Sequence, residues 1–147
     1  MSYIDENLLP EERVVYRAAL HWIVFAHALL VMVAGVALFI ALPGAPPVGA
    51  VVLLVGLVML VPPFVARQTT ELGVTNKRVI VKTGLIRRRT LELLLRQVEA
   101  ISVDQSLIGR LLGFGSITLT GTGGVREVFH TVSDPLELRR RIQGQIA

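Results

Sequence analysis

The chain contains no Asp, Glu, Lys or Arg between Arg17 and Arg67. Two apolar runs fill this interval, residues 18–42 and 48–66, with the segment PGAPP between them. As helices rising about 1.5 Å per residue, the runs would extend about 37 Å and about 28 Å. A bilayer core is about 30 Å thick, and adjacent prolines beside a glycine favour a turn. The sequence therefore predicts a transmembrane helical hairpin over residues 18–66.

The residues before the first run do not have the composition of a secretory signal. The segment MSYIDENLLPEER carries four acidic residues, and the apolar run that follows is longer than the apolar part of a signal peptide. We therefore interpret residues 1–17 as a juxtamembrane lead-in. Pro62 and Pro63 predict a kink or an early end of the second helix.

Positive charge flanks the hairpin on one side only. Arg13 and Arg17 precede it and Arg67 follows it, whereas the turn has no charge. Cytoplasmic loops carry the excess of Lys and Arg. We expect a multi-pass protein of the cell (inner) membrane with both termini cytoplasmic.

The hairpin contains two histidines, one tryptophan and several small residues among its apolar side chains. His21 and Trp22 are predicted to anchor the first helix at the headgroup level, where tryptophan is enriched. His27 lies deeper, and without an intramembrane carboxylate it does not indicate a proton pathway. The small residues favour close packing, either between the two helices or between protomers; they are Ala37, Ala41, Gly49 and Gly56.

Residues 67–147 are basic, with 13 Lys and Arg against 7 Asp and Glu. Their apolar and polar side chains alternate, as is typical of half-buried antiparallel strands. Six strands are predicted, over residues 71–74, 78–83, 88–95, 98–105, 116–121 and 125–132. The fold class is thus α+β, a transmembrane hairpin followed by a small antiparallel barrel or curled sheet.

A helix is predicted at the C-terminus. Asp134 and Pro135 are typical of a helix start, and Glu137 would complete a capping box. Leu138, Ile142 and Ile146 then repeat at helical spacing on one stripe. We expect this helix to cover an open end of the sheet.

The stretch SLIGRLLGFG at residues 106–115 lies between two predicted strands. It lacks the strand–loop–helix context and the spacing of a nucleotide-binding loop. Its apolar residues have helical spacing, and Gly113 can end a helix. We interpret the stretch as a short helix that connects two strands.

No catalytic, metal-ligating or cofactor-binding constellation is found. The chain has no cysteine, and its three histidines are far apart. His130, Asp104 and Asp134 do not form a recognisable catalytic set. We expect no enzyme, no metal, no cofactor and no nucleic-acid partner.

Three segments resemble the bacterial pleckstrin-homology-like (PH-like) domain of small membrane proteins. They are ERVVYRAALHW, VTNKRVIVKTG and VEAISVDQSLIGRLLGFGSITLTGTGG. The most specific motif is SLxxRLLGxG, matched by Ser106, Leu107, Arg110, Leu111, Leu112, Gly113 and Gly115. The resemblance covers nearly the whole chain and implies two membrane helices, then a seven-stranded barrel-like sheet closed by the C-terminal helix. It also implies members that oligomerise and have no established catalytic residues; inositol-lipid binding does not follow from it.

Two surfaces are candidates for binding. Basic residues near an anionic leaflet favour membrane contact, and the headgroup candidates are Lys77, Arg78, Lys82, Arg87, Arg88 and Arg89. The alternative for Arg87–Arg89 is a solvated edge strand protected by charge. Exposed apolar residues commonly mark interfaces, and the candidates for a homo-oligomer seam are Leu107, Ile108, Arg110, Leu111 and Leu112. The alternative is that these leucines close the domain's own core.

The sequence thus predicts a membrane-anchored, non-enzymatic interaction and assembly module that oligomerises at the cytoplasmic face. The alternative functions are an anionic-lipid headgroup-binding module and a subunit of an oligomeric pore. The expected partners are membrane lipids, a second copy of the chain and other proteins.

Overall fold

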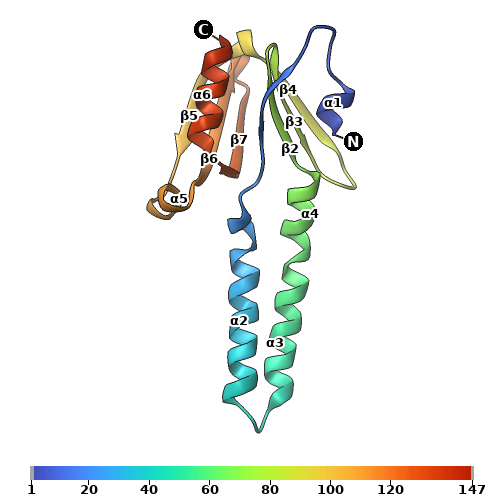
Figure 1. The fold of residues 1–147 in the computed structure, drawn as a ribbon, viewed down its shortest axis with the longest axis vertical. Coiled ribbons are helices and arrows are strands. Elements are labelled where there is room, and N and C mark those ends of the chain that lie inside the picture. The colour runs from blue at the N-terminus through green and yellow to red at the C-terminus, as the bar shows by residue number, and fades with distance from the viewer. Residues whose placement is uncertain (1, 147) are drawn as a thin grey trace. The chain divides into compact units, whose positions relative to one another are not determined.

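The computed structural model describes residues 2–146, which form two compact units. One unit combines residues 2–21 with residues 69–146, and the other consists of residues 22–68. Figure 1 shows that the first unit contains strands and short helices, whereas the second is a helical hairpin.

The helical unit contains two segments that are long and apolar enough to cross a membrane, Trp22–Ala41 and Pro46–Thr69. The first comprises the 3-10 turn η1 (Trp22–Phe25) and α2 (Ala26–Ala41), and the second comprises α3 (Pro46–Met59) and α4 (Val61–Thr69). Only 11% of each apolar window is buried in the structure, which is unlike the core helix of a soluble protein. The helix is interrupted between Met59 and Val61, just before the two prolines, which confirms the expected break.

Three glycines bring α2 and α3 together. A Cβ atom added at Gly35 would lie 2.6 Å from the backbone nitrogen of Leu53, and one at Gly49 would lie 2.4 Å from that of Phe39. A Cβ at Gly56 would lie 2.5 Å from Cγ of Met32. Gly49 and Gly56 therefore pack between the two helices of one chain, the first of the two alternatives for the small residues.

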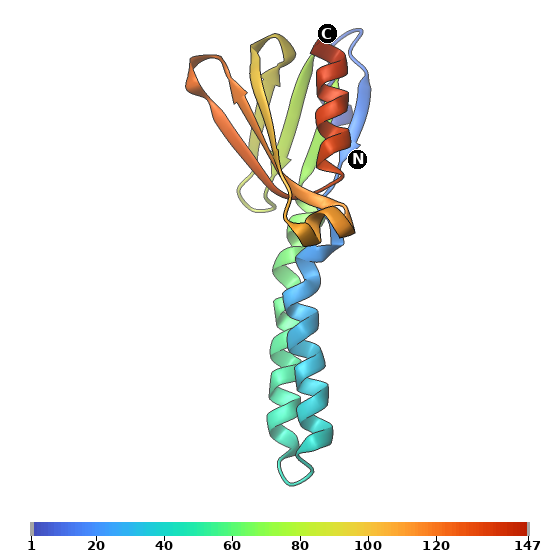
Figure 2. The same cartoon turned by 90° about the vertical axis from the view of Figure 1, so that its left-hand side faces the viewer.

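The other unit contains a four-stranded and a three-stranded antiparallel sheet, ordered β1-β2-β3-β4 and β5-β6-β7. The strands are β1 (Val14–Ala18), β2 (Glu71–Thr75), β3 (Arg78–Thr83), β4 (Arg89–Leu94), β5 (Val98–Asp104), β6 (Phe114–Gly121) and β7 (Arg126–Ser133). The remaining elements are α1 (Tyr3–Glu6), α5 (Leu107–Leu112), α6 (Pro135–Ile146) and the 3-10 turns η2 (Leu95–Gln97) and η3 (Thr122–Gly124). Figure 2 shows α6 beside the strands.

The prediction of one closed barrel or curled sheet is wrong. The turn η2 separates β4 from β5, so the chain changes sheet there instead of continuing the ladder. Within residues 2–146, the bridge between Leu20 and Val132 is the one isolated β-bridge outside the named strands. The β-structure is therefore two sheets that meet along part of one edge.

The seventh strand is β1, which the alternation of side chains did not predict. It precedes the hairpin and pairs with β2, which follows it; Arg17 is opposite Gly73 and Ala18 opposite Leu72. The start of the first apolar run therefore belongs to a sheet, and the helix begins later than hydropathy suggested, at Trp22.

The core of this unit lies between the two sheets and α6. Its buried side chains come from both sheets, for example Val81 and Ile117, and from Leu138 and Ile142 of α6. The predicted C-terminal helix is thus confirmed, although Ile146 at the end of its stripe is 44% exposed. Glu137 contacts Arg140 and Arg141 within the helix.

Candidate interaction surfaces

The six basic residues predicted to meet lipid headgroups do not form one cluster. Lys77 and Arg78 lie at the β2–β3 turn, whereas Arg87 and Arg88 lie in the connection after β3. The length of β3 separates the two groups, and a strand rises about 3.3 Å per residue. The basic residues at the two ends of β3 therefore belong to different surfaces.

Arg78 is held inside the unit by carboxylates. Its Nε atom lies 2.9 Å from Oε1 of Glu12, and its Nη1 atom contacts the carboxylate of Glu92. Nη2 of Arg78 also donates to the carbonyl oxygen of Asn7 at 2.7 Å. The side chain of Arg78 is 8% exposed and that of Glu12 is 0% exposed. The guanidinium of Arg78 is therefore not presented at the surface.

The surroundings of this ion pair shift the pKa of both partners. Hydrogen bonding to Glu12 raises the pKa of Arg78 above its ordinary value, despite burial. Burial tends to raise the pKa of Glu12, but hydrogen bonds from Arg78, the Leu9 amide and Thr75 outweigh it and lower the pKa. Both groups are charged at neutral pH, so the pair ties the lead-in to the β2–β3 turn.

A second carboxylate anchors the extreme N-terminal segment. Glu71 accepts hydrogen bonds from the Ser2 hydroxyl at 2.6 Å and from the amides of Tyr3 and Ile4. Burial acts to raise the pKa of Glu71, whereas these hydrogen bonds lower it below its ordinary value and prevail. The side chain of Ile4 is 1% exposed beside Gly73, so α1 covers the outer face of the first sheet.

Three further basic residues also have contacts within the unit. Nζ of Lys77 donates to the carbonyl oxygen of Pro10 at 2.9 Å, and Nζ of Lys82 lies 5.9 Å from the centre of the Tyr3 ring. Arg89 forms an exposed ion pair with Glu127 of β7 at 3.2 Å. An exposed pair contributes little to stability, typically below about 1 kcal/mol.

The connection from β3 to β4 is the most exposed apolar turn of the unit. Ile86 is 99% exposed and Leu85 is 63% exposed, and Arg87 and Arg88 follow directly. None of the ion pairs between described residues involves Arg87 or Arg88. Leu85 and Ile86 were not identified from the sequence as candidates for a binding surface. Two apolar residues directly before a run of arginines could have indicated one.

Helix α5 presents its leucines outward and its glycine inward. The predicted short helix is confirmed: the Ser106 hydroxyl accepts the Gly109 amide hydrogen, and Gly113 ends the helix at φ 81°. A Cβ atom at Gly109 would lie 2.5 Å from the carbonyl oxygen of Phe114, so this face approaches the backbone of β6. Leu107, Ile108, Leu111 and Leu112 are 79%, 62%, 81% and 41% exposed. These side chains do not close the core of their own unit.

The two predicted anchors at the start of the first helix differ in their surroundings. The ring of His21 lies 5.2 Å from that of Phe114 between centroids, and His21 is 7% exposed. Its amide donates to the carbonyl oxygen of Thr131 at 2.8 Å. His21 therefore packs within the strand unit. Trp22 begins the apolar segment and is 50% exposed.

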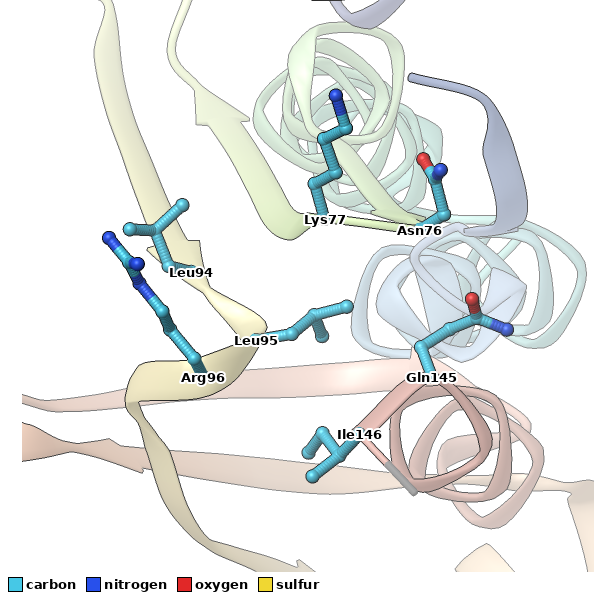
Figure 3. Close-up of a pocket in the computed structure, with 7 residues that line it drawn as sticks. All are labelled: Asn76, Lys77, Leu94, Leu95, Arg96, Gln145 and Ile146. Carbon is cyan, nitrogen blue, oxygen red and sulfur yellow. The ribbon is translucent and has the colours of Figure 1, made fainter. Parts of the chain in front are cut away.

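A surface groove of about 400 Å³ lies at the end of the unit where the β2–β3 turn is found. Figure 3 shows its walls, formed by Asn76, Lys77, Leu94, Leu95, Arg96, Gln145 and Ile146. No cluster of metal-ligating side chains occurs among residues 2–146. The groove has basic and apolar walls but no paired acid and base for catalysis.

Two small antiparallel sheets packed with a C-terminal helix form an α+β domain. The model of the family described as "Bacterial PH domain" matches residues 25–146, so the chain belongs to the bacterial PH domain family. No curated protein and no solved structure matched the chain. PH-like domains are generally non-catalytic binding modules, and they commonly bind lipids or proteins.

Proposed function

We propose that the chain is a membrane-anchored, non-enzymatic interaction module whose strand unit is held against the cytoplasmic face of the bilayer. The pairing of β1 with β2 carries this proposal. Arg17 and Gly73 face each other in the ladder, and the whole apolar hairpin lies between them in the sequence. The strands that flank the hairpin are hydrogen-bonded neighbours. The chain therefore leaves the strand unit and returns to it on the same side of a membrane.

The distribution of charge supports the orientation. The flanks of the hairpin carry Arg13, Arg17 and Arg67, and the turn around Gly44 carries no charge. Positive residues are retained in the cytoplasm. Both termini and the strand unit are then cytoplasmic, and the turn faces outward.

Topology reporters test this proposal. A phosphatase that is active only outside the cytoplasm is fused after residue 146 in one version and inserted at Gly44 in another, where a Cβ atom meets nothing within 4 Å. We expect activity at Gly44 only, with the protein resisting alkaline extraction from membranes. Activity at the C-terminus would overturn the orientation, and extraction into the soluble fraction would overturn membrane anchoring.

Homo-oligomerisation is the second candidate role, and the exposure of α5 favours it. Leu107 and Leu111 are about four-fifths exposed in a single chain, and large exposed apolar patches commonly mark interfaces. Confinement of protomers to one membrane raises their effective concentration. The seam would contain Leu107, Ile108, Arg110, Leu111 and Leu112.

A further inference from the structure

Four segments of the strand unit meet at the end where the chain passes to and from the hairpin. In the first sheet, Ala18 pairs with Leu72 and Glu71 pairs with Lys82. The exit of β1, the start of β2 and the turn after β3 therefore lie at one level. We call this the hairpin end; its segments are residues 19–21, 69–70, 84–88 and 105–113.

The second sheet places α5 at the same end. Leu20 bridges to Val132, and the amide of Ser133 donates to the carbonyl oxygen of Ala19 at 2.9 Å. Ser133 in turn pairs with Phe114, which follows α5 by two residues. Figures 1 and 2 both show α5 and the β3–β4 connection at the end of the strand unit where β2 begins.

The hairpin end carries the most exposed apolar side chains of the strand unit. Ile86 in one connection, and Leu107 and Leu111 in the other, are each at least 79% exposed. Water-soluble surfaces rarely carry several such side chains at one end of a domain. An apolar environment outside the single chain is needed to cover them.

The charges beside these side chains fit an anionic leaflet. Segments 84–88 and 105–113 contain Arg87, Arg88 and Arg110 and no Asp or Glu, although Asp104 and Asp134 border the second segment. All three arginines are exposed, and none of the ion pairs between described residues involves them. Arginines next to exposed apolar residues are typical of segments that lie in the membrane interface.

Chain connectivity favours the bilayer over a second copy of the chain as the environment that covers these side chains. His21 of the hairpin end is followed directly by Trp22, the first residue of an apolar segment able to cross a membrane. Consecutive Cα atoms are about 3.8 Å apart, so the hairpin end lies at the bilayer surface if the hairpin spans. A second copy has no comparable constraint that would place it against both connections.

We propose that the hairpin end inserts into the interface of the bilayer through two apolar tips. One tip is Leu85 and Ile86, the other is Leu107, Ile108 and Leu111, and Arg87, Arg88 and Arg110 lie at the anionic headgroups. This inference rests on the proposed membrane anchoring. The two tips fix the orientation of the strand unit against the membrane surface.

The natural absence of cysteine permits a direct test. Single cysteines are introduced in the full chain as Ile86→Cys and Leu111→Cys and labelled with an environment-sensitive fluorophore. Thr122→Cys, in the exposed connection at the opposite end of β6, is the matched aqueous control. Leu54→Cys, exposed in α3, reports separately whether the hairpin spans.

The labelled chains are placed in vesicles of phosphatidylcholine and phosphatidylglycerol that carry a nitroxide near the headgroup or deep in the acyl chain. We expect blue-shifted emission and loss of fluorescence with the shallow nitroxide at both 86 and 111, and neither effect at 122. If the fluorophore at either tip emits at the wavelength it shows in water and is quenched by iodide, the inference is wrong. Shielding of 111 from both iodide and nitroxide lipid also overturns it and assigns α5 to a second copy. Position 54 must be quenched by the deep nitroxide; if it is not, the membrane anchoring itself is wrong.

Discussion

Nε of Arg78 lies 2.9 Å from Oε1 of Glu12, which joins a residue after the hairpin to one before it. Both side chains are buried, and the Thr75 hydroxyl donates to the same carboxylate oxygen at 2.7 Å. A buried ion pair is weak evidence for net stabilisation, because both ions lose water. Removing one partner, however, leaves the other charge buried without compensation.

Glu12→Ala is therefore expected to destabilise the strand unit by about 3–5 kcal/mol. Chemical unfolding in mild detergent, followed by circular dichroism, measures the change. Glu6→Ala is the matched control, because Glu6 is exposed and belongs to the same N-terminal segment. Arg78→Ala should cost a similar amount, and the double variant less than the sum of the two. Additive losses would show that the two side chains do not act as a pair.

Acid should release the N-terminal segment. The pKa values of Glu12 and Glu71 are lowered in the folded protein, so both ionised carboxylates favour the folded state above the ordinary value of 4.5. This contribution is lost as the pH falls below 4.5 through the folded-state pKa values. The protection factors of the amides of residues 2–12, which correct for the intrinsic pH dependence of hydrogen exchange, should fall over that window and remain constant above it. The Glu71→Gln variant should show a weaker pH dependence; an unchanged profile would exclude Glu71 as its source.

The glycines between α2 and α3 should not tolerate a larger side chain. Gly35→Leu places a Cβ atom 2.6 Å from the backbone of Leu53, and backbone cannot move aside as a side-chain end can. We expect the two helices to separate and their amide exchange in micelles to increase. Gly44→Leu is the control, since a Cβ atom there meets nothing within 4 Å. Equal exchange in the two variants would contradict the close packing.

Two glycine-to-alanine changes should have opposite signs. Gly113 ends α5 at φ 81°, where alanine is strained, so Gly113→Ala should destabilise by about 1 kcal/mol or more. Gly144 lies on the exposed side of α6 with no atom near a Cβ position, and alanine there should stabilise by about 0.5–1 kcal/mol. Unfolding midpoints in one detergent measure both. A stabilising Gly113→Ala would contradict the left-handed helix end.

The assembly state is measured by light scattering in mild detergent. If α5 is a seam between copies, the wild type forms a discrete oligomer, and a variant with both Leu111→Asp and Leu112→Asp forms a folded monomer. These leucines are exposed in the single chain, so their replacement should leave its circular dichroism unchanged. A monomeric wild type would exclude the seam and agrees with α5 lying in the bilayer interface.

The sequence alone was sufficient to predict the structural features that depend on a local pattern of residues. The absence of charge from residues 18 to 66 predicted the two apolar helices, and the spacing of Leu138 and Ile142 predicted the helix that closes the core. Gly113 predicted the end of α5, because a left-handed helix end depends on the local residue type, whereas the start of the helix at Ser106 was not predicted. The alternation of apolar and polar side chains is also a local pattern, and it predicted six of the seven strands.

Only the tertiary structure decided how distant segments combine. Residues 14–18 become a strand because β2 supplies a hydrogen-bonding partner from beyond the hairpin, and no local pattern encodes that partner. Arg78 and Arg88 look alike in the sequence, yet the fold buries the first against Glu12 and exposes the second. The leucines of α5 point outward because Gly109 permits close approach to Phe114, a contact that exists only after the chain has folded back. Burial and pairing arise from contacts between segments that are far apart in the sequence, so composition and spacing could not determine them.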